Sequence, residues 1–388
     1  MRVLYVWDAD YPWDVRTEKV CLALTQAGHS VVIAARNKQG RPQSETLPEG
    51  LVERLPAFRS PWLSFPAFLN PIWLRHVRQV GLRHRVDVVI VRDLPLAPAA
   101  VLASRGKWPV VMDMAENYPA MMADIWTDGR AKPLDVLVRN PRIVSAVERR
   151  TLPHLDHVIT VVEESSQRVV RLGVPEDRVS VVSNTPSVNS VVAPSQRVPD
   201  SPMRIVYLGL MEEHRGVGDL LDAARQLAAA GVEFVLDMVG DGRDYAHFRQ
   251  RAEELGLTAP RIVFHGRLPH RDAIAVLRRG HVGVVPHHAR ESWNTTIPNK
   301  LFDYMAAGLA VVSSDAAPAA RIVGKTGAGL LFRSGDSGDL AEKLRQLLNQ
   351  EAWDRYRNAG QKAVLSQYNW ESDTRVLLDV VSRIASTS

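Results

Sequence analysis

Cysteine is almost absent from this chain: Cys21 is the only one in 388 residues. No disulfide can therefore form within the chain, and a reducing compartment such as the cytoplasm is expected. Long apolar runs are absent as well. Because no run of roughly eighteen apolar residues occurs, no membrane-spanning helix is predicted. The opening residues MRVLYV lack the separate charged and apolar regions of a signal peptide, so we expect them to form a first strand.

A large excess of either charge is also missing. The 48 Lys and Arg residues face 43 Asp and Glu, which gives a formal net charge of +5. This small and dispersed excess gives no reason to expect nucleic acid as a partner, but it is compatible with anionic substrates or a membrane surface. The length is too great for one typical domain and predicts two of similar size.

Acidic residues are missing from one long segment, between Arg54 and Asp87. Within it, residues 56–85 combine aromatic and basic side chains. These are Phe58, Arg59, Trp62, Phe65, Phe68, Trp73, Arg75, Arg78, Arg83 and Arg85. Such a mixture on a surface helix suits the interface of an anionic membrane. The alternative is that the aromatic residues lie partly in the core and the arginines on a solvated face, and both interpretations stay open.

No G-x-G-x-x-G follows a predicted strand, so a dehydrogenase of the Rossmann type is not expected. Instead, short apolar runs alternate with helical patterns from the start, which predicts doubly wound α/β sheets. The strands expected in the first half are 3–7, 31–35, 86–91, 110–113, 157–162 and 179–182. Residues 186–202 lack periodicity and carry four prolines, so they read as a linker. We therefore expect domains at 1–185 and 203–365, followed by a C-terminal helical segment, 366–388.

The most informative stretch runs from His281 to Asp315. It reads as a buried strand at 282–285, a polar loop, a helix that begins at Pro298, and a further strand from Leu309. The free N–H groups at the helix start would attract an anion at the carboxyl edge of the sheet.

Two side chains in that helix extend the argument. Lys300 adds a positive charge in the first turn, and Asp303 can accept hydrogen bonds from vicinal hydroxyls. The pair suits a nucleoside diphosphate with its ribose. An ordinary βαβ unit, in which Lys300 and Asp303 are simply solvated, would give the same sequence. The chemistry alone does not decide between this interpretation and a nucleotide site.

The residues PNKLFDYMAAGLAVVSSD, from Pro298 to Asp315, resemble the PNKLFEYMAAGxPVV signature of family-4 glycosyltransferases with the GT-B fold. Asp303 replaces the usual Glu, and Thr295 stands where the full E-x7-E motif has its first acid. The resemblance implies two Rossmann-like doubly wound domains facing a cleft, with the donor on the second domain and the acceptor on the first. It also implies a helix at 366–388 that crosses back to the first domain.

Family resemblance also assigns the donor site. In the G-R-L-x-x-x-K-G pattern, Gly209 matches, Arg215 replaces the Lys, and Leu210 replaces the Arg. Arg215 and Lys300 would then take the charge of the leaving nucleoside diphosphate. The donor-binding residues so predicted are Gly209, Arg215, Gly242, Arg267, Leu268, Thr295, Pro298, Asn299, Lys300 and Asp303.

On the acceptor side, Asp113 to Pro119 resemble the family's D-x-H-E-x-x-P segment, with Ala115 in the histidine position. Asp113 and Glu116 are the catalytic candidates here, and Glu116 would orient an acceptor hydroxyl. Glu116 could instead be an acidic residue in the first turn of the next helix. Asp14 and Arg16 resemble a D-x-R-V helix start, which suggests an acceptor site or, for Asp14, a simple helix cap.

Asp8-Ala9-Asp10 matches the DxD metal motif of the other large glycosyltransferase fold, but three letters recur by chance, and we expect neither a metal site nor a cofactor. The resemblance thus implies a retaining, metal-independent transferase that uses a nucleotide sugar and a glycan or lipid-linked acceptor. Its expected location is the cytoplasm or the inner face of the membrane. A catalytically silent nucleotide-sugar-binding partner and a sugar-nucleotide epimerase of the same fold are the alternatives.

Overall fold

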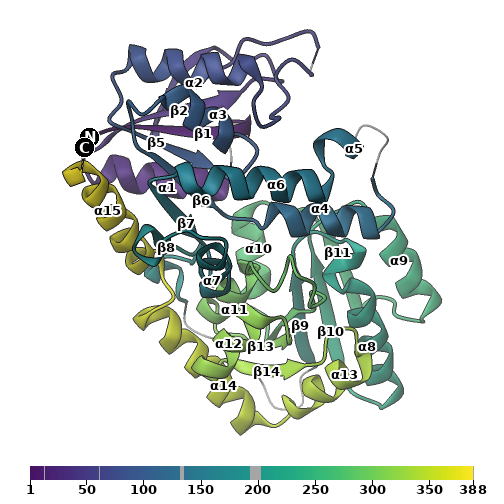
Figure 1. Ribbon diagram of the computed structural model, residues 1–388. Coiled ribbons are helices and arrows are strands. Elements are labelled where there is room, and N and C mark those ends of the chain that lie inside the picture. The colour runs from purple at the N-terminus through teal and green to yellow at the C-terminus, as the bar shows by residue number, and fades with distance from the viewer. Residues whose placement is uncertain (13, 61, 132–134, 193–201, 388) are drawn as a thin grey trace. The chain divides into compact units, whose positions relative to one another are not determined.

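The computed structural model describes residues 1–388 except 13, 61, 132–134, 193–201 and 388 (Figure 1). The chain divides into two compact units. The first unit comprises Met1–Asn184 with Asp373–Ser388, and the second comprises Thr185–Ser372. Of the predicted linker 186–202, residues 193–201 lie outside the described part. No helix in the described chain is long and apolar enough to cross a bilayer.

The first unit is built on an eight-stranded sheet in the order β3-β4-β2-β1-β5-β6-β7-β8. Neighbouring strands are parallel, except that β3 runs antiparallel to β4. The strands are β1 (Arg2–Asp10), β2 (Ser30–Arg36), β3 (Ser44–Leu47), β4 (Gly50–Arg54), β5 (Val88–Arg92), β6 (Val110–Met114), β7 (His157–Thr160) and β8 (Val179–Val181).

Strand β1 is the centre of this sheet, because residues 3–6 are wholly buried and pair with β2 on one side and β5 on the other. A parallel strand covered on both faces needs an unbroken apolar run, and this explains why the run could be recognised in the sequence. The strand order reverses between β1 and β5. Ligands of doubly wound sheets bind outside the carboxyl ends of the strands at such a point.

Helices flank this sheet on both faces (Figure 1). They are α1 (Val15–Gln26), α2 (Pro71–Arg83), α3 (Ala97–Ser104), α4 (Tyr118–Thr127), α5 (Asp135–Val138), α6 (Pro141–Thr151) and α7 (Glu163–Arg171), with the 3-10 turns η1 (Leu152–His154) and η2 (Glu176–Arg178). The last helix, α15 (Trp370–Thr387), belongs to this unit from Asp373 onward. The Ser183 backbone N–H donates to the Asp373 carboxylate at 3.1 Å and ties that helix to the end of β8.

The second unit holds a six-stranded parallel sheet in the order β11-β10-β9-β12-β13-β14. Its strands are β9 (Met203–Leu208), β10 (Phe234–Val239), β11 (Ile262–Gly266), β12 (Val282–Val285), β13 (Ala310–Ser314) and β14 (Gly329–Phe332). Its helices are η3 (Val188–Ser190), η4 (Glu213–Arg215), α8 (Val217–Ala229), α9 (Tyr245–Glu254), α10 (His270–Leu277), α11 (Lys300–Ala306), α12 (Ala317–Thr326), α13 (Ser337–Gln346) and α14 (Gln350–Ser366). Here the order reverses between β9 and β12.

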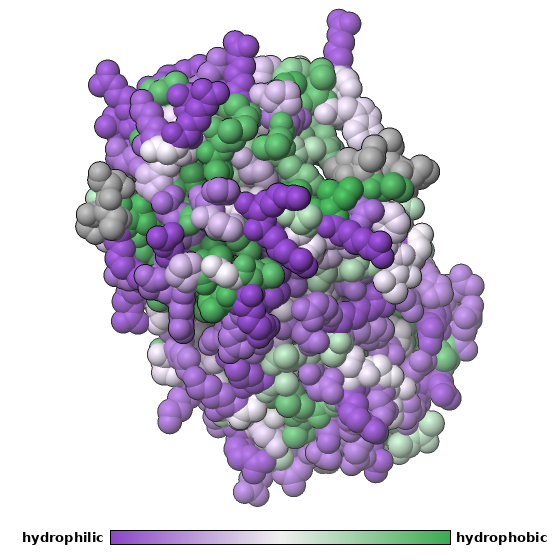
Figure 2. All heavy atoms as spheres, viewed as in Figure 1, coloured by the Kyte–Doolittle hydropathy of each residue, from purple (hydrophilic) through white to green (hydrophobic). Residues whose placement is uncertain are grey.

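Each unit is therefore a Rossmann-like doubly wound domain, as the sequence predicted. One local boundary differs: the helix expected to begin at Pro298 begins at Lys300. The Pro298 carbonyl accepts from the Leu301 N–H at 3.1 Å, so a tighter turn precedes the helix proper. On the face drawn in Figure 2, apolar side chains reach the surface among charged ones.

Candidate functional site

The carboxyl ends of β9 and β12 spread apart at the switch point of the second sheet. The two strands are paired only through Val282 and Gly283. Beyond that pair the Tyr304 hydroxyl bridges them: it accepts from the Leu208 N–H at 2.8 Å and donates to the Val284 carbonyl at 3.4 Å. A Cβ on Gly283 would lie 2.3 Å from the Tyr304 ring, so only glycine leaves room for this bridge. In doubly wound sheets the crevice that binds a ligand lies outside the carboxyl ends of the strands at such a switch point.

Lys300 lies at this crevice. A Cβ on Gly209, directly after β9, would be 3.0 Å from the Lys300 Nζ, so the ammonium lies against the backbone at the end of that strand. Lys300 is 7% exposed, and its Nζ has no hydrogen-bond acceptor within the described chain. Its close neighbour is the Tyr207 ring, 4.0 Å from the Nζ to the ring centre. A buried cation held only by an aromatic face favours an anionic ligand.

The electrostatics of Lys300 agree with this interpretation. Burial, followed by the charge of Arg215, lowers the pKa of Lys300 well below its usual range, against a smaller opposite effect of Asp303. Asp303 lies half-buried on α11, one turn from the start of the helix. The ammonium would regain its ordinary charge if an anion bound beside it.

Arg215 ends the short turn η4. Its Nε donates to Glu212 at 3.3 Å, and its guanidinium carbon lies 5.3 Å from the centre of the Trp293 ring. A Cβ on Gly216 would lie 1.8 Å from the Pro286 carbonyl oxygen, so the backbone after Arg215 packs directly against the end of β12. This contact requires glycine, and it holds Arg215 near enough to Lys300 for its charge to act on that ammonium.

His287 was not predicted from the sequence. It follows β12, is 1% exposed, and neither of its ring nitrogens has a partner within the described chain. The ring centres of His287 and Trp293 are 4.2 Å apart, and the Trp293 Nε1 also lacks a partner. Burial, followed by the charge of Lys300 and then Arg215, lowers the pKa of His287 well below its usual range. The signal that could have revealed it is a histidine immediately after a buried strand and its proline.

The remaining predicted donor residues divide into two groups. Pro298 and Asn299 form the turn before α11 at the crevice, whereas Thr295 is buried and donates its hydroxyl to the Glu291 carbonyl at 2.8 Å. Arg267 and Leu268 follow β11, two strands away from β9, where Arg267 is exposed. They share the sheet edge with Lys300, but the structure records no contact between them and it.

Gly242 has a packing role. A Cβ there would lie 2.4 Å from the Met211 carbonyl oxygen. The loops that follow β9 and β10 therefore touch through their backbones. This contact accounts for the glycine without a ligand.

In the first unit, Asp113 and Arg16 bind each other. The Asp113 carboxylate accepts from the Arg16 Nε at 2.9 Å, from its Nη2 at 2.5 Å and from the Tyr5 hydroxyl at 2.8 Å. Burial raises the pKa of Asp113, but Arg16 outweighs it and holds the pKa below its ordinary value. This buried pair joins the start of α1 to the end of β6. Direct catalysis by Asp113, or acceptor binding by Arg16, would have to compete with that pair.

The other two acceptor-side residues have clear positions. Asp14 caps α1 by accepting from the Thr17 N–H at 2.9 Å and also pairs with Arg92 at 2.5 Å, so the helix-cap interpretation is confirmed. Glu116 is exposed and precedes α4, which begins at Tyr118. The alternative that placed Glu116 in the first turn of that helix is therefore wrong.

Asp8 was considered only as half of a metal motif, yet it lines a cavity of about 410 Å³ at the carboxyl ends of β1 and β2. Burial, with a contribution from Asp93, raises the pKa of Asp8 to about 6. Asp10 instead accepts from the Lys38 backbone N–H at 2.5 Å. Within the described ranges, no three His, Cys, Asp or Glu side chains gather in a group that could hold a metal.

Segment 56–85 fits neither the membrane-interface interpretation nor the core interpretation throughout. Trp73 is fully buried in the core, whereas Trp62 is exposed. Arg78 donates to the Ala103 carbonyl at 2.7 Å, and Arg83 pairs with Glu53 at 3.2 Å. Among the exposed large apolar residues of this segment, Trp62, Leu63 and Leu69 belong to the loop before α2, and Leu82 lies on the helix itself.

Comparison with known proteins identifies both units. Residues 14–185 match the family model "Glycosyl transferase 4-like domain", and residues 202–350 match "Glycosyl transferases group 1". Glycogen synthase of Mycobacterium tuberculosis is 24% identical over 375 residues, which cover 90% of this chain and 86% of the relative. Phosphatidyl-myo-inositol mannosyltransferase of Mycobacterium leprae is 29% identical over 185 residues, 47% of either chain.

Solved structures show the same architecture. Sucrose-phosphate synthase from Thermosynechococcus elongatus matches with a TM-score of 0.78, 17% identity and full coverage of both chains. The UDP complex of HepE from Anabaena matches with a TM-score of 0.70 and 16% identity, over 99% of this chain and 100% of the other. The chain is therefore a glycosyltransferase of the family-4 type with the GT-B fold.

Proposed function

We propose that this enzyme transfers a sugar, with retention of anomeric configuration and without a metal, from a nucleoside diphosphate sugar to a glycan or lipid-linked acceptor. The observation that carries the donor assignment is the buried Lys300 ammonium without an acceptor, placed beside Arg215 and His287. Titratable groups perturbed in this way cluster at functional sites. A diphosphate supplies the hydrogen-bonding oxygens that Lys300 and His287 lack within the described chain, and Arg215 adds its charge beside them.

The chemical step follows from this arrangement. The bond between the sugar C1 and the phosphate oxygen breaks, and C1 forms a new bond to the acceptor oxygen on the same face. The acceptor proton passes to the leaving phosphate, so no protein base is required. Lys300 and Arg215 stabilise the charge that develops on the diphosphate, which is the role a divalent metal has elsewhere.

Two further parts of the proposal concern the partners. The solved HepE complexes contain UDP and UDP-glucose, which supports a uridine nucleotide as the first donor to test. We also propose a peripheral location at an anionic membrane through residues 56–85, supported by the exposed Trp62. The specific PNKLFEYM-type subgroup stays a prediction.

A thermal-shift screen against UDP, GDP, ADP, CMP and TDP sugars tests the donor assignment. A nucleotide sugar at about 100 times its Kd should add about 2.7 kcal/mol to the free energy of unfolding. The same ligand should give little shift with Lys300→Ala. Stabilisation that survives Lys300→Ala unchanged, or no stabilisation by any diphosphate sugar, would contradict the proposal.

A further inference from the structure

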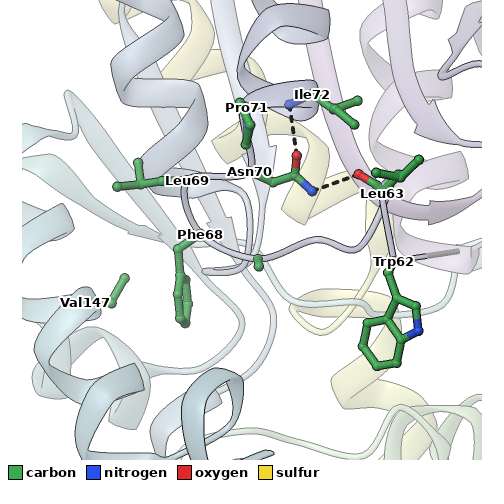
Figure 3. Close-up of a pocket in the computed structure, with 9 residues that line it drawn as sticks. Trp62, Leu63, Phe68, Leu69, Asn70, Pro71, Ile72 and Val147 are labelled. Carbon is green, nitrogen blue, oxygen red and sulfur yellow. Dashed lines mark hydrogen bonds between the residues drawn. The ribbon is translucent and has the colours of Figure 1, made fainter. Parts of the chain in front are cut away.

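The loop before α2 forms an apolar groove of about 640 Å³ with α6 (Figure 3). Three large apolar side chains stand exposed on this loop: Trp62 at 61%, Leu63 at 49% and Leu69 at 58%. Phe68 and Val147 complete the lining. Exposed apolar surface concentrated in this way marks an interaction site more often than scattered single residues do.

Asn70 fixes the shape of the groove. Its amide nitrogen donates to the Leu63 carbonyl at 3.0 Å, and its oxygen accepts from the Ile72 N–H at 2.9 Å (Figure 3). The same nitrogen also donates to the Phe65 carbonyl at 2.9 Å. Because the amide of Asn70 is fully engaged in hydrogen bonds with the loop backbone, the groove presents mainly apolar groups. The loop is thereby held in a shape that keeps Trp62 and Leu69 exposed.

Phe68 also lines the 410 Å³ cavity at the carboxyl ends of β1 and β2, so groove and cavity adjoin. The cavity has a different character. Its polar lining consists of Asp8, Arg36, Lys38, Tyr118 and Arg139. Three cations and one carboxylate line the cavity, Asp10 also acts on Arg36, and Asp135 lies 3.8 Å from Arg139. The three cations are the groups that an anionic head would contact there.

Arg36 is a built part of this cavity. It is 5% exposed, its Nε donates to the Ser64 hydroxyl at 2.9 Å, and its guanidinium carbon lies 6.0 Å from the Phe65 ring centre. A buried guanidinium held in one orientation is suited to phosphate oxygens. The same contact with Ser64 ties the cation to the loop that forms the apolar groove.

The same cavity also carries groups that suit hydroxyls, among them Asp8 and Tyr118. Burial, followed by the carboxylates of Asp93, Asp8 and Glu116, raises the pKa of Tyr118 well above its usual range. Asp8 and Glu116, the residue predicted to orient an acceptor hydroxyl, therefore lie near the same phenol. Hydroxyls of a sugar would find both donors and acceptors there.

We propose that the groove and the cavity together bind one amphiphile, the hydrocarbon chain in the groove and its phosphorylated sugar head in the cavity. This molecule is the acceptor, so the inference rests on the proposed function and specifies its acceptor class. The groove supplies apolar lining, the cavity supplies the buried Arg36 with the exposed Lys38 and Arg139, and Phe68 belongs to both linings, so the two sites adjoin. Neither a soluble glycan nor a free anion would use both halves.

Calorimetric titration of the whole protein with three probes, each below its micellar concentration, tests the inference. Dodecyl phosphate carries chain and anion, dodecyl maltoside carries the chain with a neutral sugar head, and inorganic phosphate carries the anion alone. Dodecyl phosphate should bind at least about tenfold more tightly than either of the others, since it engages both the charge-assisted contacts and the apolar surface. Equal affinity for the two dodecyl probes, or binding only above the micellar concentration, would overturn the inference.

Matched variants separate the two halves. Leu63→Asp should weaken dodecyl phosphate about tenfold or more, whereas Leu102→Asp, at a similarly exposed leucine on α3, should not. Replacing both Lys38 and Arg139 by Gln should bring dodecyl phosphate close to dodecyl maltoside, and Arg149→Gln on α6 is the control. If the affinity for dodecyl phosphate is unchanged by Leu63→Asp or by the double substitution, the binding is adventitious and the inference is overturned.

Failure here is distinguishable from failure of the proposed function. The proposal for the donor predicts that UDP binding is unchanged by Leu63→Asp and weakened at least about tenfold by Lys300→Ala. Dodecyl phosphate binding should show the reverse pattern. UDP binding without specific dodecyl phosphate binding removes the acceptor inference alone, whereas absence of UDP binding removes the donor proposal.

Discussion

At the scale of single residues, the positions that matter are charged groups left without partners. Lys300 could be predicted because it stands inside a recognisable signature, and the structure places its ammonium against the backbone at the carboxyl end of β9. His287 could not, because its importance depends on how Trp293 and Lys300, later in the same stretch, and the distant Arg215 pack around it. The place of Asp8 in a cavity was missed for a different reason, because in the sequence this residue stands out only as part of a three-residue metal motif.

Lys300→Ala should weaken UDP binding by about 1.5–3 kcal/mol, the scale of a hydrogen bond to a charged group. Free uridine, which lacks the diphosphate, should lose much less. Calorimetric titration of both ligands measures the difference. Lys325→Ala, an exposed lysine on α12, is the control and should change neither affinity. Equal losses for uridine and UDP would contradict the assignment of Lys300 to the diphosphate.

Binding of UDP should be accompanied by proton uptake. The pKa values of His287 and Lys300 are both lowered in the free protein, first by burial and then by neighbouring cations, which for His287 include Arg215, His214 and His288. A bound diphosphate raises both pKa values, so protons are taken up and UDP binds more tightly as the pH falls from about 8 to 6. The nearby carboxylates, Glu212 and Asp303, are present in the free protein and in the UDP complex alike, so they do not account for the difference between the two.

Titrations in Tris and in HEPES measure this uptake, because the two buffers release protons with different enthalpies. His287→Gln should abolish the part of the uptake that appears near neutral pH, while His270→Gln on α10 should leave it intact. Identical binding enthalpies in both buffers would show that no proton is exchanged. If the proton uptake is unchanged in His287→Gln, Lys300 alone takes up the proton.

At the scale of elements, the sequence predicts strands better than their ends. The core strands appear as apolar runs because they are covered on both faces. The start of α11 was misplaced by two residues because Pro298 opens a tighter turn. The pair of Arg16 and Asp113 joins residues 97 positions apart, so it depends on the strand order, which no local pattern reveals.

Gly283→Ala should destabilise the second unit by about 1–3 kcal/mol, the range for overpacking a core. The new methyl group would overlap the Tyr304 ring, and the hydroxyl bridge between β9 and β12 would be displaced. Gly324→Ala on α12 is the matched control. It has no atom within 4 Å of the new Cβ and should be neutral or stabilising. Urea unfolding measures both, and equal effects would remove the packing argument.

At the scale of the whole molecule, each unit presents the carboxyl edge of its own sheet, and the predicted residues fall on those edges. The fold class was therefore recoverable from the alternation of strands and helices together with one signature. The acceptor site was harder to predict from the sequence. There the candidate residues Asp113 and Arg16 bind each other. The cavity is lined by Asp8, which stood only in a metal motif, and by Arg36, Lys38 and Arg139, which belong to no motif.

Turnover should survive EDTA. Lys300 and Arg215 supply positive charge at the leaving group, and Asp10 is already engaged by the Lys38 backbone N–H. Asp10→Asn should accordingly leave donor affinity unchanged. Release of nucleoside diphosphate, measured with and without EDTA, tests this. A strict requirement for Mn²⁺ or Mg²⁺ that disappears in Asp10→Asn would restore the metal motif.

Catalysis itself is the property that the whole site must support, because three polar groups usual in the family are replaced by Leu210, Thr295 and Ala115. Loss of one electrostatic contact lowers a rate by roughly 10²–10³ when nothing replaces it. His287 offers a replacement in the donor crevice, since both of its ring nitrogens are unpartnered beside Lys300 and Arg215. We therefore expect slow hydrolysis of the right nucleotide sugar without acceptor, detectable as release of free nucleoside diphosphate.

His287→Gln should lower that hydrolysis by at least about tenfold if the imidazole replaces a missing contact, and His270→Gln should leave it unchanged. The affinity for the intact nucleotide sugar, measured by calorimetry, tells the two possible defects apart. A loss of rate with little loss of affinity places the contact in the transition state rather than in the bound donor. A chain that binds the nucleotide sugar tightly but never releases the diphosphate, with any acceptor extract, is a silent partner of another transferase.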